Sequence, residues 1–216
     1  GGLVLNKDVY DMQPGEALQL INFEPSTEGG YRRLNGTTKY NSTIVPQVSS
    51  ANERIQMSAI FNDKIIAARG GTVSYGDTSG SWTSLATSQG TTNTYDFDKF
   101  NFNGTSKIIV ATGEAAAFTV DSSFNVDVIN ATGGGTAPTN PKFVKTFANH
   151  VFYGGMSNST HSILFSVPFS EDNFTSGSGA GEVKVGDIVT GLKVFRDELF
   201  IFCQRKIYKL TGTTST

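Results

Sequence analysis

An internal repeat constrains the fold of this 216-residue chain more than any other feature of the sequence. Four times, an apolar segment ends in Phe and is followed by a short polar turn and a second apolar segment. The four phenylalanines lie 41, 45 and 48 residues apart, at Phe61, Phe102, Phe147 and Phe195. A period in the forties, with several short strands in each unit, is typical of a β-propeller blade. The repeat therefore predicts an all-β chain of successive blades, with these four residues at equivalent positions.

The segments after the turns support this interpretation. The second apolar segment of each repeat is followed by a third strand-like segment, at residues 72–75, 116–120, 162–166 and 206–210. The second segments are apolar on both faces, which is expected where neighbouring blades cover both sides of a sheet. We therefore expect Phe152 and Phe200 to lie in the core. The alternative fold is a Greek-key β-sandwich, but its turns recur about every 8 to 12 residues without a longer period.

The repeats divide the chain into two predicted regions. Residues 50–216 hold about four blades, and the last unit stops after its third strand. Residues 1–49 have no blade pattern and form an extended lead-in with turns at Pro14-Gly15 and Gly29-Gly30. Because a propeller closes into a ring to cover its sheet edges, either an N-terminal strand completes the fourth blade or the chain is part of a longer one. We expect the second.

Composition agrees with a folded all-β protein and excludes several classes. The 24 Gly favour turns, and the 16 Phe and 7 Tyr supply large side chains for a core. A formal net charge of −2 argues against a dedicated nucleic-acid binder or membrane-surface binder. The single thiol, Cys203, cannot form an internal disulfide, and its apolar surroundings predict a buried structural cysteine.

No motif predicts catalysis. The carboxylates in the repeat region show no spacing that pairs two of them for glycoside hydrolysis; they are Asp96, Asp98, Glu114, Glu171, Asp172, Glu182 and Asp187. His150 and His161 are eleven residues apart and lack the spacing of a zinc site. The sequence therefore predicts no enzyme, no catalytic residue, no cofactor and no metal site.

Two alternatives from other classes stay open. One is a secreted or surface carbohydrate-binding, lectin-like propeller, for which Trp82 and Tyr95 are the candidate sugar-stacking aromatics in loops. The other is a propeller glycosidase. The segment from Asp77 to Trp82 approaches the Asp-box turn of sialidase-like propellers, but its spacing differs by one residue and it occurs once. We interpret it as a structural turn.

Both ends of the chain resemble one known family. The lead-in contains Gln13-Pro14-Gly15-Glu16-Ala17, Leu20-Ile21-Asn22-Phe23-Glu24-Pro25, Gly29-Gly30-Tyr31-Arg32-Arg33-Leu34-Asn35-Gly36 and Lys39-Tyr40. The last repeat contains Ile188-Val189-Thr190-Gly191-Leu192 and Ile207-Tyr208-Lys209-Leu210-Thr211-Gly212. These segments resemble the tail hub or nozzle family of short-tailed bacteriophages, which are propeller proteins at the distal end of the DNA conduit.

The resemblance implies a structural virion protein of the phage tail that acts in viral genome ejection. It implies a homo-oligomeric ring of six copies that contacts adaptor or portal-proximal proteins and tail fibre or needle proteins. Genome DNA would pass through without specific binding, along a neutral or mildly acidic lumen, and no part would insert into a membrane. We expect the lead-in to reach a neighbouring subunit, with Tyr31, Arg32 and Arg33 as contact residues. The alternative for the two arginines is an ordinary solvated or salt-bridged strand position.

Overall fold

The computed structural model describes residues 2–28, 30–48 and 54–211. The chain forms two compact units, Gly1–Tyr40 and Asn41–Thr216, which are described separately.

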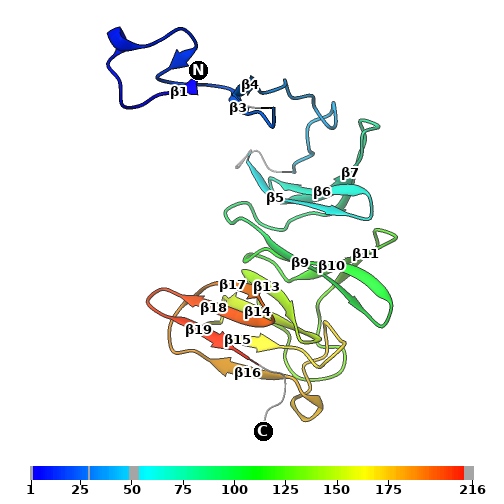
Figure 1. Ribbon diagram of the computed structural model, residues 1–216. Helices are drawn as coiled ribbons and strands as arrows, with labels where there is room; N and C mark the ends of the chain where they lie inside the picture. Colours follow the sequence, from blue (N-terminus) through cyan, green and yellow to red (C-terminus); the bar gives the residue numbers. More distant parts are fainter. Residues whose placement is uncertain (1, 29, 49–53, 212–216) are drawn as a thin grey trace. The chain divides into compact units, whose positions relative to one another are not determined.

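The second unit consists of four antiparallel sheets, named blades 1 to 4 in chain order (Figure 1). Blade 1 contains β5 (Ile55–Phe61), β6 (Lys64–Arg69), β7 (Thr72–Gly76) and β8 (Trp82–Ala86). Blade 2 contains β9 (Asp96–Phe102), β10 (Thr105–Ala111), β11 (Phe118–Asp121) and β12 (Val126–Val128). Blade 3 contains β13 (Phe143–Phe147), β14 (His150–Met156), β15 (Ser159–Phe165) and β16 (Gly181–Lys184), with a short 3-10 helix η2 (Ser176–Ser178) before β16. Blade 4 contains β17 (Val189–Phe195), β18 (Glu198–Cys203) and β19 (Ile207–Leu210).

This arrangement is that of propeller blades. In every sheet, strands adjacent in sequence are also adjacent in space. The first strands gather along one side of the unit, since β13 packs beside both β9 and β17. Consecutive meanders with neighbouring first strands are the repeating unit of a β-propeller. The predicted all-β propeller fold is therefore confirmed.

The four repeated phenylalanines are equivalent, as predicted. Each is the last residue of the first strand of its blade and pairs with the first residue of the second strand, three residues later. Both residues of every intervening turn have positive φ; the turns are Asn62-Asp63, Asn103-Gly104, Ala148-Asn149 and Arg196-Asp197. Two-residue hairpin turns with this geometry are type I′ turns, whose twist matches that of the flanking strands.

A hydrophobic cluster fills each of the three spaces between successive blades. Phe61 contributes to the cluster between blades 1 and 2, Phe102 to the next, and Phe147 to the third. The second strands carry most of the fully buried side chains, and every residue of β14 is buried. Blades 1 to 3 thus each pack the repeated phenylalanine against the blade that follows.

Blade 4 departs from this pattern because the described chain places no further sheet on its outward face. Burial alternates along β18, so that Leu199 and Ile201 are buried against blade 3. Phe200 and Phe202 point to the other side. The expectation that Phe152 and Phe200 both lie in the core is correct for Phe152, which is 3% exposed, and wrong for Phe200, which is half-buried.

The segment just before the blades belongs to the second unit and covers part of blade 1. Asn41 Nδ2 donates to the carbonyl of Asp77, and Trp82 Nε1 donates to the carbonyl of Thr43 at 3.0 Å. Arg69 reaches the carbonyl of Val45. The first unit accordingly ends at Tyr40, whereas the predicted lead-in extends to residue 49, because residues 41–45 hydrogen-bond to the blade.

The first unit contains only short elements. Strand β1 (Gly2–Leu3) pairs in parallel with β2 (Glu16–Ala17), and β3 (Phe23–Pro25) pairs with β4 (Tyr31–Arg33). A 3-10 helix, η1 (Val9–Asp11), begins after Asp8, whose side chain accepts the backbone N–H of Tyr10. None of the described residues 2–28 and 30–40 is buried. This unit therefore lacks a hydrophobic core of its own in the described chain.

Candidate functional site

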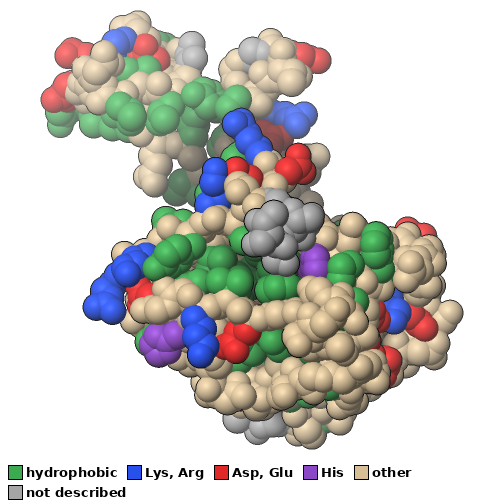
Figure 2. Space-filling model, turned by 90° about the horizontal axis from the view of Figure 1, so that it is seen from below, with side chains coloured by type: hydrophobic (Ala, Val, Ile, Leu, Met, Phe, Trp, Pro, Cys, Tyr) green, Lys and Arg blue, Asp and Glu red, His purple; other side chains and the backbone are tan. Residues whose placement is uncertain are grey.

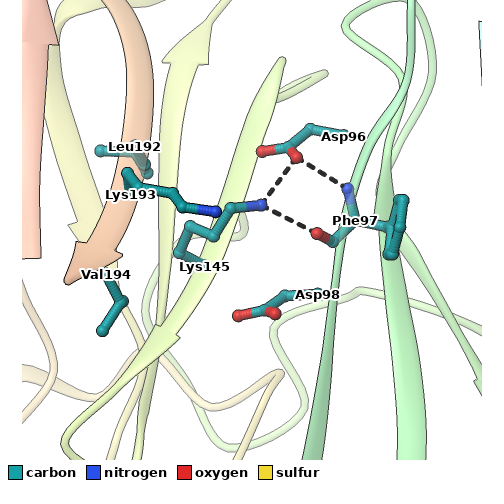
Figure 3. Close-up of a pocket in the computed structure, with 7 residues that line it drawn as sticks. All are labelled: Asp96, Phe97, Asp98, Lys145, Leu192, Lys193 and Val194. Carbon is teal, nitrogen blue, oxygen red and sulfur yellow. Dashed lines mark hydrogen bonds and ion pairs between the residues drawn. The ribbon is translucent and has the colours of Figure 1, made fainter. Parts of the chain in front are cut away.

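The candidate site is a hollow bordered by the first strands of blades 2, 3 and 4 (Figure 3). Strand β9 contributes two acids, β13 contributes a lysine, and β17 contributes a second lysine. Its lining consists of Asp96, Phe97, Asp98, Lys145, Leu192, Lys193 and Val194.

Asp96 connects blade 2 to blade 3. Its Oδ2 accepts the backbone N–H of Val144 at 3.0 Å, and its Oδ1 lies 2.7 Å from Lys145 Nζ. Lys145 also donates to the carbonyl of Phe97, so its ammonium group is held by two oxygens of β9 (Figure 3). This ion pair is partly shielded from water, because the Lys145 side chain is 14% exposed.

Asp98, two residues further along β9, also accepts a backbone N–H of β13. Its Oδ2 accepts both the backbone N–H and the hydroxyl of Thr146, each at 2.7 Å. Strand β13 is the first strand of its sheet, so the N–H groups on its outer edge have no strand partner. The two aspartates satisfy these N–H groups and so join two sheets that share no backbone ladder. The acids of the hollow therefore have a structural role in joining the blades.

Lys193 of β17 points toward the hollow near Lys145 (Figure 3). Among the described residues, no salt bridge to Lys193 is present. The hollow thus holds one neutralised lysine, one exposed lysine and two carboxylates with protein partners. This arrangement offers no acid and base directed at a common point.

The other carboxylates weighed from the sequence also have protein partners. Glu114 accepts the backbone N–H groups of three consecutive residues, Thr91 to Asn93. Glu171 pairs with Lys107. The remaining three accept hydrogen bonds from residues near them: Asp172 from Thr132 and Ser170, Glu182 from Ser159, and Asp187 from the N–H groups of Ile188 and Arg205. Each of these acids stabilises a turn or joins two segments.

The two aromatics considered for sugar stacking are not equivalent. Tyr95 is buried in the cluster between blades 1 and 2, and its hydroxyl donates to the carbonyl of Gly90. Burial, reinforced by Glu114, raises the pKa of Tyr95 to about 12. The expectation of an exposed Tyr95 is therefore wrong, because the residue enters the core just before β9. Trp82 is half-buried, and its indole N–H is bound to Thr43.

The Asp77 segment forms the turn between β7 and β8, as predicted. Asp77 Oδ1 accepts the backbone N–H of Ser79 at 2.9 Å, and its Oδ2 lies 2.7 Å from Lys64 Nζ. The Lys64 ammonium, together with Ser79, holds the pKa of Asp77 well below its usual range. The turn is thus held by its own charged residues.

His150 and Cys203 are buried, whereas His161 is exposed on β15. His150 is buried, and its Nδ1 lies 2.6 Å from the carbonyl of Ser166. Cys203 is buried between blades 3 and 4, and burial with the nearby Asp187 raises the pKa of its thiol. Within residues 2–28, 30–48 and 54–211, His, Cys, Asp and Glu side chains form no group of three that could hold a metal ion. The same ranges contain no helix with the length and apolar character needed to cross a membrane.

The predicted contact residues Tyr31, Arg32 and Arg33 form strand β4 of the first unit, and all three are exposed. Arg32 Nε lies 2.6 Å from Glu24 Oε1 on the paired strand β3. The backbone of Gly2 lies close to the Tyr31 ring, since a Cβ at Gly2 would come within 3.1 Å of it. The structure thus brings these three residues to one surface strand, with Arg32 held in an intrachain ion pair.

The edge contacts made by Asp96 and Asp98 were not predicted. The available signal was the Asp-x-Asp spacing at the start of a first strand, which places both carboxylates on one face. Their partners lie 48 residues away in the next repeat. Only the placement of blade 3 beside blade 2 identifies them.

Comparison with known proteins gives only distant structural likeness. No family model and no curated protein matches the sequence. Three similar solved structures are BBS1N in complex with ARL6DN, BamB from Moraxella catarrhalis and the N-terminal domain of Nup159. They are 8%, 10% and 12% identical to this chain, with TM-scores of 0.49, 0.44 and 0.37. The matches cover 71%, 71% and 82% of this chain and 48%, 42% and 55% of those chains, so the chain spans about half their length. The assignment of the blades rests on the strand order and register given above.

Proposed function

We propose that this chain is a non-enzymatic structural subunit of a phage tail nozzle or hub, and that it assembles with further copies into a ring around the DNA path. The observation that carries the proposal is the exposed apolar surface of the first unit. Ten large hydrophobic side chains in its 40 residues are exposed: Leu3, Leu5, Val9, Tyr10, Leu18, Ile21, Phe23, Tyr31, Leu34 and Tyr40. Exposed apolar surface on this scale is characteristic of segments that bind a partner.

The blades supply the second support, because they are suited to a rigid body. A hydrophobic cluster joins each blade to the next, and the Asp96 and Asp98 contacts also join blade 2 to blade 3. The charged side chains Asp96, Asp98 and Lys145 of the first strands form these contacts between blades. A ring subunit needs at least a rigid body and an apolar segment for assembly. The resemblance of both chain ends to the tail hub or nozzle family supports the phage tail as the place of assembly.

Charge is consistent with a conduit that does not retain DNA. The chain has 17 Lys and Arg against 19 Asp and Glu. Each phosphate neutralised by a basic residue adds a salt-dependent attraction that would slow a passing genome. We expect weak duplex binding whose affinity falls less than about tenfold between roughly 50 and 200 mM salt. Fluorescence anisotropy with a labelled duplex measures this, and a steep salt dependence would contradict a passive conduit.

The virion assignment is tested with particles. Mass spectrometry of gradient-purified phage that encodes this chain is expected to find it in a fixed copy number relative to the portal protein. The control is the infected-cell lysate from which the particles were cleared. A chain that stays in the cleared lysate and is missing from the particles would overturn the proposal.

A further inference from the structure

Strand β17 of blade 4 repeats the donors that bind the carboxylate of Asp96 in blade 3. Val144 and Lys145 stand three and two residues before the repeated phenylalanine of blade 3. The Val144 N–H donates to Asp96 Oδ2 at 3.0 Å, and Lys145 Nζ donates to Asp96 Oδ1 at 2.7 Å. In blade 4, Leu192 and Lys193 stand at the same two positions. The repeat therefore places a second pair of carboxylate donors on β17.

The register directs the Leu192 N–H to the edge of its sheet, as it directs the Val144 N–H. Phe195 and Glu198 flank the type I′ turn and form a hydrogen-bonded pair. Hydrogen-bonded and non-hydrogen-bonded pairs alternate along an antiparallel ladder, so Leu192 and Ile201 form a non-hydrogen-bonded pair. Because β17 is the first strand of its sheet, the Leu192 N–H points away from β18 to the outer edge.

Blade 3 does not supply to blade 4 the acceptors that blade 2 supplies to blade 3. Asp96 and Asp98 stand six and four residues before the repeated phenylalanine of blade 2. Pro141 and Phe143 stand at these positions in blade 3, and neither side chain carries an oxygen. In the described part of the chain, no acid pairs with Lys193. Because the acceptors of blade 3 come from the blade before it, this difference involves blades 2 to 4 alone.

The donors of β17 border the hollow between the first strands of blades 2, 3 and 4. Its volume of about 500 Å³ lies within the roughly 300–1,000 Å³ of small-molecule sites. Leu192 and Lys193 both line it, and the Lys193 side chain points toward Lys145 (Figure 3). Asp96 already neutralises Lys145, so Lys193 supplies the positive charge that a ligand would meet.

The attraction for an anion in this hollow is local. On the face that Figure 2 shows, Lys and Arg side chains lie in small separate groups beside acidic ones. The whole chain has 17 basic residues against 19 acidic ones. Binding therefore depends on directed donors, and one ammonium group beside one backbone N–H matches the two oxygens of a carboxylate.

We infer that the hollow binds the carboxylate group of a small organic anion. One carboxylate oxygen accepts the N–H of Leu192, and the other accepts a hydrogen of the Lys193 ammonium. This arrangement copies the one that Val144 and Lys145 make with Asp96. The site uses blades 2 to 4 and is independent of the phage tail role.

Amide NMR of the purified full chain with sodium acetate tests the inference. At constant ionic strength, the Leu192 N–H signal is expected to move and to saturate with a dissociation constant of about 1–10 mM. Lys193→Met removes a charge from an exposed side chain, so it should raise this constant at least about threefold and leave the thermal melt unchanged. Lys193→Arg keeps the charge and should bind acetate more tightly than Lys193→Met does. Lys184→Met, at an exposed site on β16, is the matched control and should leave the constant unchanged.

Three results would overturn the inference. The first is a Leu192 signal that does not move up to about 100 mM acetate. The second is an equal response of that signal to sodium sulfate, which would indicate general anion binding. The third is an equal loss of affinity in Lys184→Met and Lys193→Met, which would indicate an effect of overall charge. Failure here is separable from failure of the virion role, because that role is tested by the presence of the chain in particles.

Discussion

Phe195 takes in blade 4 the position that Phe147 takes in blade 3, yet Phe195 is 57% exposed and Phe147 is 9% exposed. Both residues end a first strand and precede a type I′ turn. The difference arises because blade 4 covers Phe147, whereas no described part of the chain covers Phe195. The same contrast separates Phe152 from Phe200 and gives a direct test of the blade assignment.

Phe152→Ala is expected to lower the free energy of unfolding by about 3–5 kcal/mol, because it leaves a cavity between blades 3 and 4. Phe200→Ala at the equivalent position should cost about half of this or less, since the side chain is only half-buried. Urea denaturation of the two variants measures the difference. Equal losses would mean that blade 4 is covered in the monomer.

The type I′ turns predict opposite effects of two substitutions. Ala148 has a φ of 51°, a conformation that Asn adopts more readily than Ala, so Ala148→Asn should stabilise the protein by about 0.5–1 kcal/mol. Asn103→Ala in the equivalent turn, where φ is 54°, should destabilise it by a similar amount of about 0.5–1 kcal/mol. Thermal melts of both variants provide the comparison. Shifts of the same sign would show that the turns do not share this geometry.

The Asp98 contact predicts a graded series of stability losses in three variants. Asp98→Ala leaves the backbone N–H of Thr146 without its acceptor and should cost about 1–3 kcal/mol. Asp98→Asn keeps an acceptor oxygen and should cost less. Thr146→Val removes only the hydroxyl donor and serves as the control for the backbone bond. If Asp98→Ala unfolds at the same urea concentration as the wild type, the acid does not join the two blades.

The sequence predicts contacts between residues that are close in the chain better than contacts between residues that are far apart in it. The repeated phenylalanines and their turns were predictable because strand pattern and turn chemistry lie within ten residues. The partners of Asp96 and Asp98 were not, because they depend on how one blade is placed on the next. Phe200 was assigned to the core because an apolar strand looks the same whether or not a further sheet covers it. Tyr95 lies in the connection before β9, as predicted, but its burial was not predictable from the polar residues that precede it.

Acid stability should depend on Asp187, whose side chain is 3% exposed. Burial alone would raise its pKa, but the N–H groups of Arg205 and Ile188 outweigh burial and lower it. A carboxyl whose pKa is lower in the folded state stabilises the fold above its unfolded pKa of about 3.9, and this stabilisation is lost as the pH falls through the folded pKa. The stability difference between the wild type and Asp187→Asn should therefore be full at pH 7 and shrink below about pH 4. Urea titrations across this range measure it, with Phe152→Ala as the uncharged control whose difference should not follow pH. A difference for Asp187→Asn that stays constant from pH 7 downward would contradict this role.

Cryo-electron microscopy of the phage tail tests the central claim most directly, because it shows whether this chain assembles around the DNA path. The account predicts a closed ring in which the four blades fit the density of each subunit. A tail whose ring density cannot hold the blades, or particles without the chain, would contradict it.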